Sequence, residues 1–221
     1  MNQIIDIHTH IERPGAIVNA SPGTFCPKPG LLYSIGIHPW DSDTATANDI
    51  ALLEKLAIHP QVVMIGETGL DKLRGAPLAI QIEMMQRHIT LSETLGKPLV
   101  VHCVRSAGEL LGLRRSLNPS QPWIFHGFRG GAAQAMQLLA AGIVPSYGAR
   151  HQKEAVAITP VNRLLAETDD QTALSIEQII AMLGESHPEC PSIVNQIKQN
   201  ILGLIYAQNS VICGISGKRV E

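Results

Sequence analysis

Six side chains of metal-ligand type recur at comparable places along this chain, each at the end of a short apolar run or just after one. They are His8, His10, Glu67, His102, His126 and Asp169. Imidazole nitrogens and carboxylate oxygens suit Zn, Mn, Co, Ni or Mg, and the sequence does not rank these metals. Because one tetrahedral ion needs fewer ligands, we predict two divalent metal ions that share Glu67 as a bridge.

Such a centre would carry out metal-assisted hydrolysis with a metal-bound hydroxide, because a bound cation lowers the pKa of water toward neutrality. We assign catalytic roles to Glu67, as the bridge, and to Asp169, which would bind metal and take the proton of the attacking water. Asp6 and Glu167 are expected behind the ligands. Asp6 would orient a histidine ring, as metal-bound histidines usually require.

The fold that would position these ligands follows from short apolar runs that alternate with segments of helical period. The expected strands are residues 3–7, 16–19, 32–36, 62–66, 99–102, 123–126, 143–147 and 164–167. The expected helices are residues 47–57, 79–95, 107–116, 132–141, 153–158, 176–183 and 190–206. Regular βα alternation favours a parallel sheet, and eight strands favour a closed (β/α)8 TIM-like barrel over an open doubly wound sheet.

One α/β domain is expected over residues 1–206, and residues 207–221 form a C-terminal tail of weak periodicity. The segment 12–31 is short and rich in Pro and Gly, so it has no room for a full helix. We therefore expect a barrel that is trimmed after its second strand.

The placement of the ligands distinguishes a site from scattered polar residues. Strand alternation puts Asp6, His8 and His10 on one side of the first strand, which faces the barrel interior. Taken singly, each of the six ligands could be a satisfied core or capping residue. Together they gather at the C-terminal ends of strands, where barrel enzymes build their active sites.

Composition and charge exclude several classes of protein. The formal net charge of -2 removes the basic field that most non-specific nucleic-acid binders use. No apolar run is long enough to span a bilayer and no signal peptide is evident, so we expect a cytoplasmic protein without a membrane partner. Cys26, Cys103, Cys190 and Cys213 form no CxxC pair and are expected to be reduced, mostly buried thiols.

The remaining histidines are not assigned to the site. His59, His88, His151 and His187 lie in expected helices or loops, and we expect them at the surface. Cys103 should point away from His102 toward the helical layer, so it is not proposed as a nucleophile.

Several motifs occur in the order of a known family. They are DIHTH at residues 6–10, GIHP at 36–39, IGETGLD at 65–71, PLVVH at 98–102, HGFRG at 126–130, ETD at 167–169, and Asn200. With these motifs the chain, from Ile4 to about Leu204, resembles a short variant of the TatD family of metal-dependent hydrolases, a branch of the amidohydrolase-like barrels. The resemblance implies the same six metal ligands. Family members are DNases or other phosphodiesterases, and some are D-aminoacyl-tRNA deacylases, so the resemblance leaves the substrate open.

Three departures from the family pattern concern the walls of the site. The segment between His10 and Gly36 is shorter than usual, and the family's Pro-Tyr-Leu after Asp169 is replaced by residues 170–174. The Arg that usually stands two positions after the histidine of the fifth strand is replaced by Val104, and an Arg follows it. This leads to a hypothesis on substrate contacts, for which the candidates are His38, Arg105 and Arg129.

Arg105 and Arg129 would clamp a phosphate beside the metals, or else they are two solvated surface arginines. His38 would contact substrate, or else it caps the loop beside Pro39.

The leading functional hypothesis is a metal-dependent hydrolase of phosphoester bonds, a TatD-like deoxyribonuclease or phosphodiesterase that acts on short or flexible substrates such as single-stranded DNA ends. An alternative keeps the metals and changes the bond to a carbonyl ester or amide, as in a D-aminoacyl-tRNA deacylase. A third is a barrel that binds metal without turnover. The oligomeric state, the bond type and the physiological metal stay open.

Overall fold

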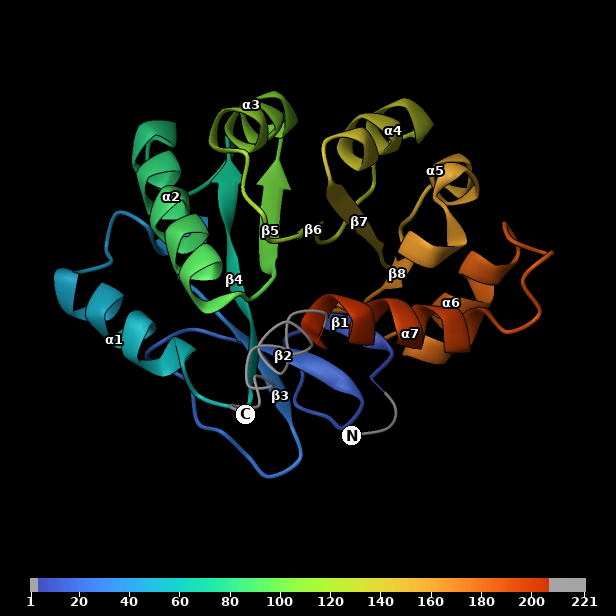
Figure 1. The fold of residues 1–221 in the computed structure, drawn as a ribbon, viewed down its shortest axis with the longest axis horizontal. Coiled ribbons are helices and arrows are strands. Elements are labelled where there is room, and N and C mark those ends of the chain that lie inside the picture. The colour runs from blue at the N-terminus through green and yellow to red at the C-terminus, as the bar shows by residue number, and fades with distance from the viewer. Residues whose placement is uncertain (1–3, 207–221) are drawn as a thin grey trace, which may run out of the picture.

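The computed structural model describes residues 4–206 and shows eight parallel strands in the order β1 to β8 around a barrel (Figure 1). The strands are β1 (Asp6–Thr9), β2 (Ala16–Ala20), β3 (Leu32–Ile35), β4 (Val62–Asp71), β5 (Leu99–Val104), β6 (Trp123–Phe125), β7 (Ile143–Tyr147) and β8 (Leu165–Ala166). Each strand pairs with the next one in the chain. This confirms the predicted (β/α)8 TIM-like barrel.

The barrel closes where the end of β8 meets β1. Thr9 forms a parallel bridge to Asp169, the backbone N–H of His10 donates to the carbonyl of Asp169 at 3.1 Å, and the N–H of Asp169 donates to the carbonyl of His8 at 3.0 Å. Closure therefore brings the metal-ligand residues at the two ends of the sheet side by side.

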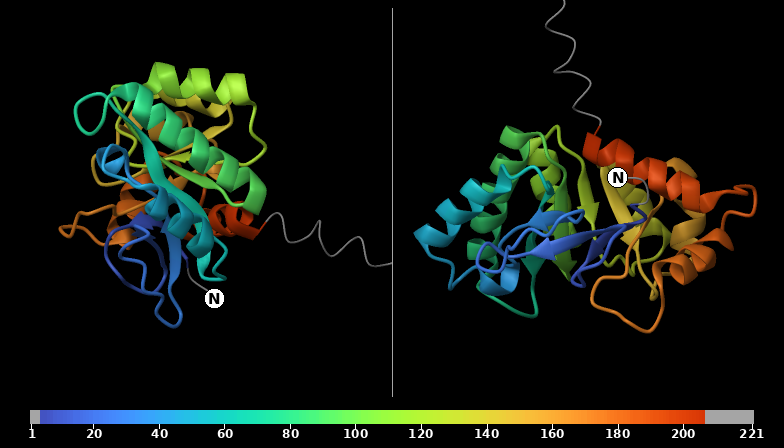
Figure 2. Two further views of the ribbon diagram at one scale, coloured as in Figure 1. Left: turned by 90° about the vertical axis from the view of Figure 1, so that its left-hand side faces the viewer. Right: turned by 90° about the horizontal axis from the view of Figure 1, so that it is seen from below.

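Helices cover the outside of the later strands, as Figures 1 and 2 show. They are α1 (Ala47–Ala57), α2 (Leu78–Leu95), α3 (Ala107–Leu117), α4 (Ala132–Ala140), α5 (Lys153–Ile158), α6 (Ile176–Gly184) and α7 (Ile193–Tyr206), with short 3-10 turns η1 (Pro39–Asp41) and η2 (Val161–Arg163). No helix lies between β1 and β2 or between β2 and β3. The barrel is therefore trimmed after its second strand, as predicted.

Local sequence accounts for several helix boundaries. Thr46 and Asp49 form a capping box that starts α1, and Ser175 and Gln178 form the same reciprocal pair at α6. The helix α2 ends at Gly96, whose φ of 63° is the left-handed conformation that glycine adopts without a steric penalty. These devices satisfy backbone groups that the helix ends would otherwise leave unpaired.

The barrel core is built from nearly continuous apolar strands, because a parallel strand is covered on both faces. All ten residues of β4 are buried, and so are all five of β7. The largest of the fully buried side chains are Trp123, Tyr33, Tyr147 and Phe128. The core thus forms a rigid frame on which the site residues are mounted.

Two predicted strands differ from the observed ones by more than two residues at one end. The first strand was expected over residues 3–7, but β1 runs from Asp6 to Thr9, so His8 lies inside it. The fourth was expected to stop at Gly66, but β4 continues to Asp71 and contains Glu67. Polar residues at these positions resemble a strand end in the sequence, whereas the barrel continues the ladder through them because their side chains face one another in the interior.

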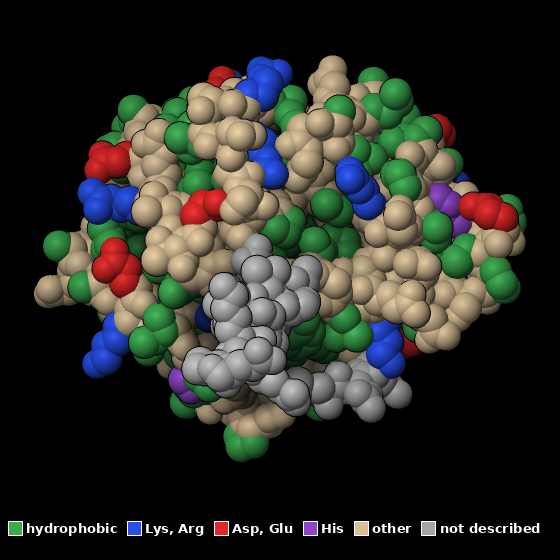
Figure 3. All heavy atoms as spheres, in the orientation of Figure 1, with side chains coloured by type: hydrophobic (Ala, Val, Ile, Leu, Met, Phe, Trp, Pro, Cys, Tyr) green, Lys and Arg blue, Asp and Glu red, His purple; other side chains and the backbone are tan. Residues whose placement is uncertain are grey.

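The surface is mixed in charge. On the face drawn in Figure 3, Lys and Arg side chains are interspersed with Asp and Glu side chains, in agreement with a net charge near zero. No helix within residues 4–206 has the length and hydropathy needed to cross a membrane. The predicted C-terminal tail, residues 207–221, lies outside the described residues.

Candidate metal centre

Glu67 lies at the centre of the predicted ligand cluster and contacts histidines from several strands. Its Oε1 is 2.7 Å from His126 Nε2 and 2.9 Å from His102 Nδ1. Its Oε2 is 3.4 Å from His8 Nε2 and 3.5 Å from His10 Nε2. The two oxygens of one carboxylate thus face two separate groups of imidazole nitrogens.

Asp169 completes the group around the second oxygen of Glu67. Its Oδ1 is 3.4 Å from His10 Nε2 and 3.8 Å from His8 Nε2. Asp169 has a φ of 55°, a left-handed conformation that is uncommon outside glycine and that is stabilised here by the bridge to β1. The structure therefore brings together all six residues that the sequence predicts as metal ligands.

A bulge in β4 directs Glu67 into the barrel. The register of β4 against β5 shifts between Ile65 and Thr68, which gives β4 one extra residue at Glu67. Gly66, just before it, has a φ of 118°, and a Cβ there would lie 2.3 Å from the carbonyl oxygen of Val100. Only glycine fits this close approach, so the IGE sequence is needed to place the central carboxylate.

Both ring nitrogens of His102 face carboxylate oxygens, which can only accept. Its Nε2 lies 3.3 Å from Asp71 Oδ2, and its Nδ1 lies 2.9 Å from Glu67 Oε1 and 3.3 Å from His126 Nε2. With a cation bound, a proton on Nε2 toward Asp71 would leave the lone pair of Nδ1 for the metal, as is usual for a metal-bound histidine.

Buried polar atoms without a partner support the same conclusion. Both ring nitrogens of His8 are buried and make no hydrogen bond within the described residues, and the same holds for His126 Nδ1 and Glu167 Oε2. An unpaired buried nitrogen costs free energy unless something binds it. Three subsets of the cluster have ligand atoms within 4.8 Å of one another: His8 with His10 and Glu67; His8 with His126 and Asp169; His38 with Glu67 and His102. The donor set fits divalent metal ions.

The charges of the cluster are strongly coupled. Burial alone would raise the pKa of Glu67, but the facing His126 and the hydrogen bonds from His10, His102 and His126 hold it well below its ordinary value. Burial would lower the pKa of His126, yet the charges of Glu67 and Glu167 raise it well above the ordinary range. Hydrogen bonds to Asp169 and Glu67 raise the pKa of His10 to about 9. The site therefore favours anionic carboxylates and an added positive charge.

Asp6 lies behind the cluster but does not hydrogen-bond to an imidazole ring. Its Oδ1 accepts from the backbone N–H of Thr168 at 3.1 Å and of His8 at 3.4 Å, and Arg13 pairs with its other oxygen. Within residues 4–206 it receives no hydrogen bond from an imidazole, so the predicted contact to a histidine ring is wrong. Asp6 instead joins β1 to β8, because barrel closure places Thr168 beside it.

Glu167 is fully buried beside His126. Its Oε1 accepts from the backbone N–H of Gly127 and lies 3.7 Å from His126 Nδ1. Glu167 therefore lies behind the predicted ligand His126, as the sequence predicts.

Two polar residues near the cluster were missed by the sequence analysis. Asp71 accepts from the indole N–H of Trp40 at 2.7 Å as well as from His102, and Asn19 accepts from the backbone N–H of Glu67 at 2.9 Å. Asp71 is four residues beyond Glu67 on one strand, so strand alternation could have identified it once the length of β4 was known. Asn19 could not be identified in this way, because it lies on β2, which β3 separates from β4 in the sheet, and only the fold brings it to Glu67.

The predicted substrate contacts border the cluster. His38 accepts from the backbone N–H of Trp40 at 3.2 Å, which is the expected capping contact, and its Nε2 also lies 3.1 Å from Glu67 Oε1. Arg105 and Arg129 are exposed and line one cavity of about 480 Å³ together with His102, His126 and Asp169. The structure thus brings both arginines to the mouth of the metal centre.

Several side chains outside the site differ from expectation. His88 and His187 were predicted at the surface but are buried, at 0% and 5% exposure, because His88 packs against Ile37 after β3 and His187 packs against Val156 of α5. Cys26 is exposed and Cys103 and Cys190 are half-buried, so the prediction of mostly buried thiols is wrong for these three; Cys213 lies outside the described residues. Burial raises the pKa of Cys103 to about 12, which agrees with excluding it as a nucleophile.

Comparison with known proteins identifies the family. The sequence model of the TatD related DNase family matches residues 26–199. The chain belongs to the TatD family. The matched segment begins after β2, so His8 in β1 and His10 just after it lie outside the match and reach the ligand cluster through the fold.

The TatD relatives of this chain carry names that describe different activities. An uncharacterized metal-dependent hydrolase TatD of Mycobacterium tuberculosis is 36% identical over 152 residues, which are 63% of this chain and 58% of the relative. A 3'-5' ssDNA/RNA exonuclease TatD of Cronobacter turicensis is 28% identical over 188 residues, 77% of this chain and 69% of the relative. The match thus spans about three fifths of the first relative's length. The first relative is named a metal-dependent hydrolase and the second an exonuclease for single-stranded DNA and RNA.

Solved TatD structures confirm the fold. A TatD homologue of Escherichia coli K12 superposes with a TM-score of 0.80 at 21% identity and covers 91% of this chain and 97% of its own. A TatD family hydrolase of Entamoeba histolytica gives a TM-score of 0.73 at 17% identity, covering 93% and 98%.

Proposed function

We propose that this protein is a two-metal phosphodiesterase that cleaves single-stranded DNA ends. The observation that carries the proposal is the cavity in which two exposed arginines, Arg105 and Arg129, stand beside the ligand cluster. A guanidinium binds two phosphate oxygens at once, so this wall suits an anionic phosphodiester better than a neutral ester or amide. The exonuclease names of some relatives support the same substrate class.

The two oxygens of Glu67 face two overlapping groups of ligand atoms, as two ions would require. One group contains His8, His10, Asp169 and the Oε2 of Glu67, and the other contains His102, His126 and the Oε1 of Glu67. His126 also lies within 4.8 Å of the ligand atoms of His8 and Asp169, so it borders both groups. Divalent ions, when bound, supply Lewis acidity and acidify water.

The chain's own residues supply the other parts of the reaction. Asp169 is held as a carboxylate: burial would raise its pKa, but hydrogen bonding from His10 and the nearby imidazoles lower it. It is one-quarter exposed toward the cavity, so it can accept the proton of an attacking water. Arg105 and Arg129 bind the non-bridging oxygens of the phosphate, and His38 lies between the metal ligands and the substrate.

The test uses purified protein stripped with chelator and reloaded with Mn, Mg or Zn. We expect metal-dependent hydrolysis of bis(p-nitrophenyl) phosphate and of a single-stranded oligonucleotide, at about two ions per chain by elemental analysis. The Asp169→Asn variant should lose at least about 100-fold in rate. Hydrolysis of carbonyl esters or aminoacyl esters without phosphodiester cleavage would instead support the alternative bond type and overturn the proposal.

A further inference from the structure

A second cavity adjoins the metal centre on the side opposite Arg105. It measures about 520 Å³ and is lined by residues that follow β6, β7 and β8. Gly127, Phe128, Arg129 and Asp169 line both this cavity and the one that contains Arg105. The two cavities therefore meet beside Asp169 and form one continuous path across the mouth of the barrel.

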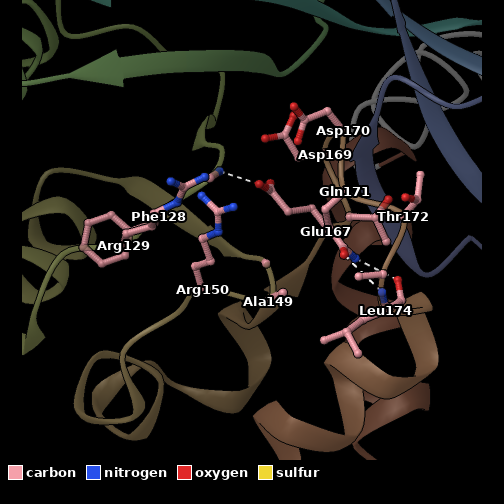
Figure 4. Close-up of a pocket in the computed structure, with 14 residues that line it drawn as sticks. Phe128, Arg129, Ala149, Arg150, Glu167, Asp169, Asp170, Gln171, Thr172 and Leu174 are labelled. Carbon is pink, nitrogen blue, oxygen red and sulfur yellow. Dashed lines mark hydrogen bonds between the residues drawn. The ribbon is translucent and has the colours of Figure 1, made fainter.

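A third arginine, Arg150, lines the second cavity. It is exposed, it follows β7, and Figure 4 shows its side chain extending toward the segment of Phe128 and Arg129, across from Asp169 and Asp170. Arg105, Arg129 and Arg150 make no salt bridge and no side-chain hydrogen bond to any of residues 4–206, and all three line the two cavities. Arg115, at the end of α3, also has no such partner but lines neither cavity. Arg13, Arg74, Arg87, Arg114 and Arg163 each contact a carboxylate, an aromatic ring or a backbone carbonyl.

The chemistry of the second cavity favours an anion with polar groups beside it. Gln171 and Thr172 line it together with Arg150. Asp170 is the one acidic side chain of its lining that is neither fully buried, as Glu167 is, nor a member of the ligand cluster, as Asp169 is. Bound cations would offset the charge of Asp169, which leaves Arg129 and Arg150 against the one exposed carboxylate of Asp170 and a net positive lining.

We infer that Arg150 binds a backbone phosphate of an oligonucleotide that runs from the Arg105 cavity, across the metal centre, into the Arg150 cavity. The inference rests on the proposed function and sharpens it, because a strand that occupies both cavities extends on either side of the cleaved bond. The substrate is then a chain of several nucleotides and not a mononucleotide or small diester. Arg129, which lines both cavities, contacts the strand near the cleaved phosphate.

The test measures binding of fluorescein-labelled, phosphorothioate-linked oligothymidylates to Mn-loaded protein by anisotropy. We expect Arg150→Ala to weaken binding of a pentanucleotide about 5-fold and to reduce the slope of log affinity against log salt by about 0.7, the value for one phosphate contact on a single strand. The same measurement is made with a dinucleotide, and Arg150→Ala should weaken its binding by a smaller factor than that of the pentanucleotide. Arg150→Lys should retain the salt slope, because it keeps the charge.

Arg115→Ala is the matched control, since Arg115 is an exposed arginine in the last turn of α3, at the opposite end of the barrel. It should bind both oligonucleotides like the unaltered protein. The inference is overturned if Arg150→Ala behaves like this control or loses the same factor on both lengths. Bis(p-nitrophenyl) phosphate separates the two ideas: if it is not hydrolysed while strand binding depends on Arg150, the proposed function fails and the binding path stands.

Discussion

His8 and His88 are both fully buried, yet the structure treats them in opposite ways. His88, in α2, has a partner for each nitrogen: Nδ1–H donates to the carbonyl of Met84 at 2.8 Å, and Nε2 accepts from the backbone N–H of Ile37 at 2.9 Å. His8, in β1, makes no hydrogen bond with either nitrogen among the described residues. Burial alone therefore does not mark a candidate ligand, whereas a buried imidazole that lacks a hydrogen bond and faces two carboxylates does.

The difference reflects what each histidine is for. His88 holds the end of β3 against α2, and a proton on its Nε2 would face the N–H of Ile37. Burial accordingly lowers its pKa to about 4, and the ring stays neutral. His8 faces the carboxylates of Glu67 and Asp169, so its unpaired nitrogens are oriented for a cation.

The largest effect is expected from Glu67→Gln, which removes the charge shared by both groups of ligands. Hydrolysis should fall by about 1000-fold or more, and the bound metal should fall below one ion per chain, because loss of even an outer-shell partner costs about 10- to 100-fold. Elemental analysis and rate measurements on the same preparation check this. Unchanged metal content would contradict the bridging role.

A pH titration of stability isolates His88. Its pKa is lowered from about 6.5 in the unfolded chain to about 4 in the fold, so its contribution is complete above pH 6.5 and is lost as the pH falls toward 4. The loss amounts to roughly 3 kcal/mol. Urea denaturation of metal-free protein at pH 7.5 and pH 4.5 measures it.

The comparison variant for that titration is His88→Gln. It should be less stable at pH 7.5 but should show a smaller drop on acidification, and its metal content after reloading should equal that of the unaltered protein. Equal pH slopes for the two proteins would show that His88 is not the group that titrates.

Metal loading should stabilise the fold through the cluster alone. At a free ion concentration about 100 times the dissociation constant, binding adds about 2.7 kcal/mol to the free energy of unfolding. The His88→Gln variant should gain the same increment, and Glu67→Gln should gain far less. An equal gain in all three proteins would place the metal outside the cluster.

The smallest effect concerns Asp71, which we assign as a positioning residue for His102. Asp71→Asn should weaken metal affinity about 10- to 100-fold, measured by competition with a chromophoric chelator, because the amide no longer fixes the ring with its proton on Nε2. Asp43→Asn, at an exposed aspartate in the same half of the barrel, should have no effect. A normal metal affinity for Asp71→Asn would remove this role.

The sequence alone determined the ligand types and the strands that carry them. The alternation of apolar runs with helical segments predicts a parallel barrel, and the spacing of His8 and His10 predicts a shared face, because both depend on local periodicity. The bulge at Glu67 was not predicted, since it appears only in the pairing of β4 with β5.

The tertiary structure decided which buried polar groups have partners. The sequence assigned His8 to the site and His88 to the surface, and only the packing of α2 against Ile37 shows that His88 is buried and satisfied. Barrel closure places His8 beside Asp169. Arg150 likewise becomes a candidate phosphate contact only because the segments after β7 and β8 line one cavity with it. Such contacts join residues far apart in the chain, so no local pattern records them, and they are decided by the geometry of the closed barrel.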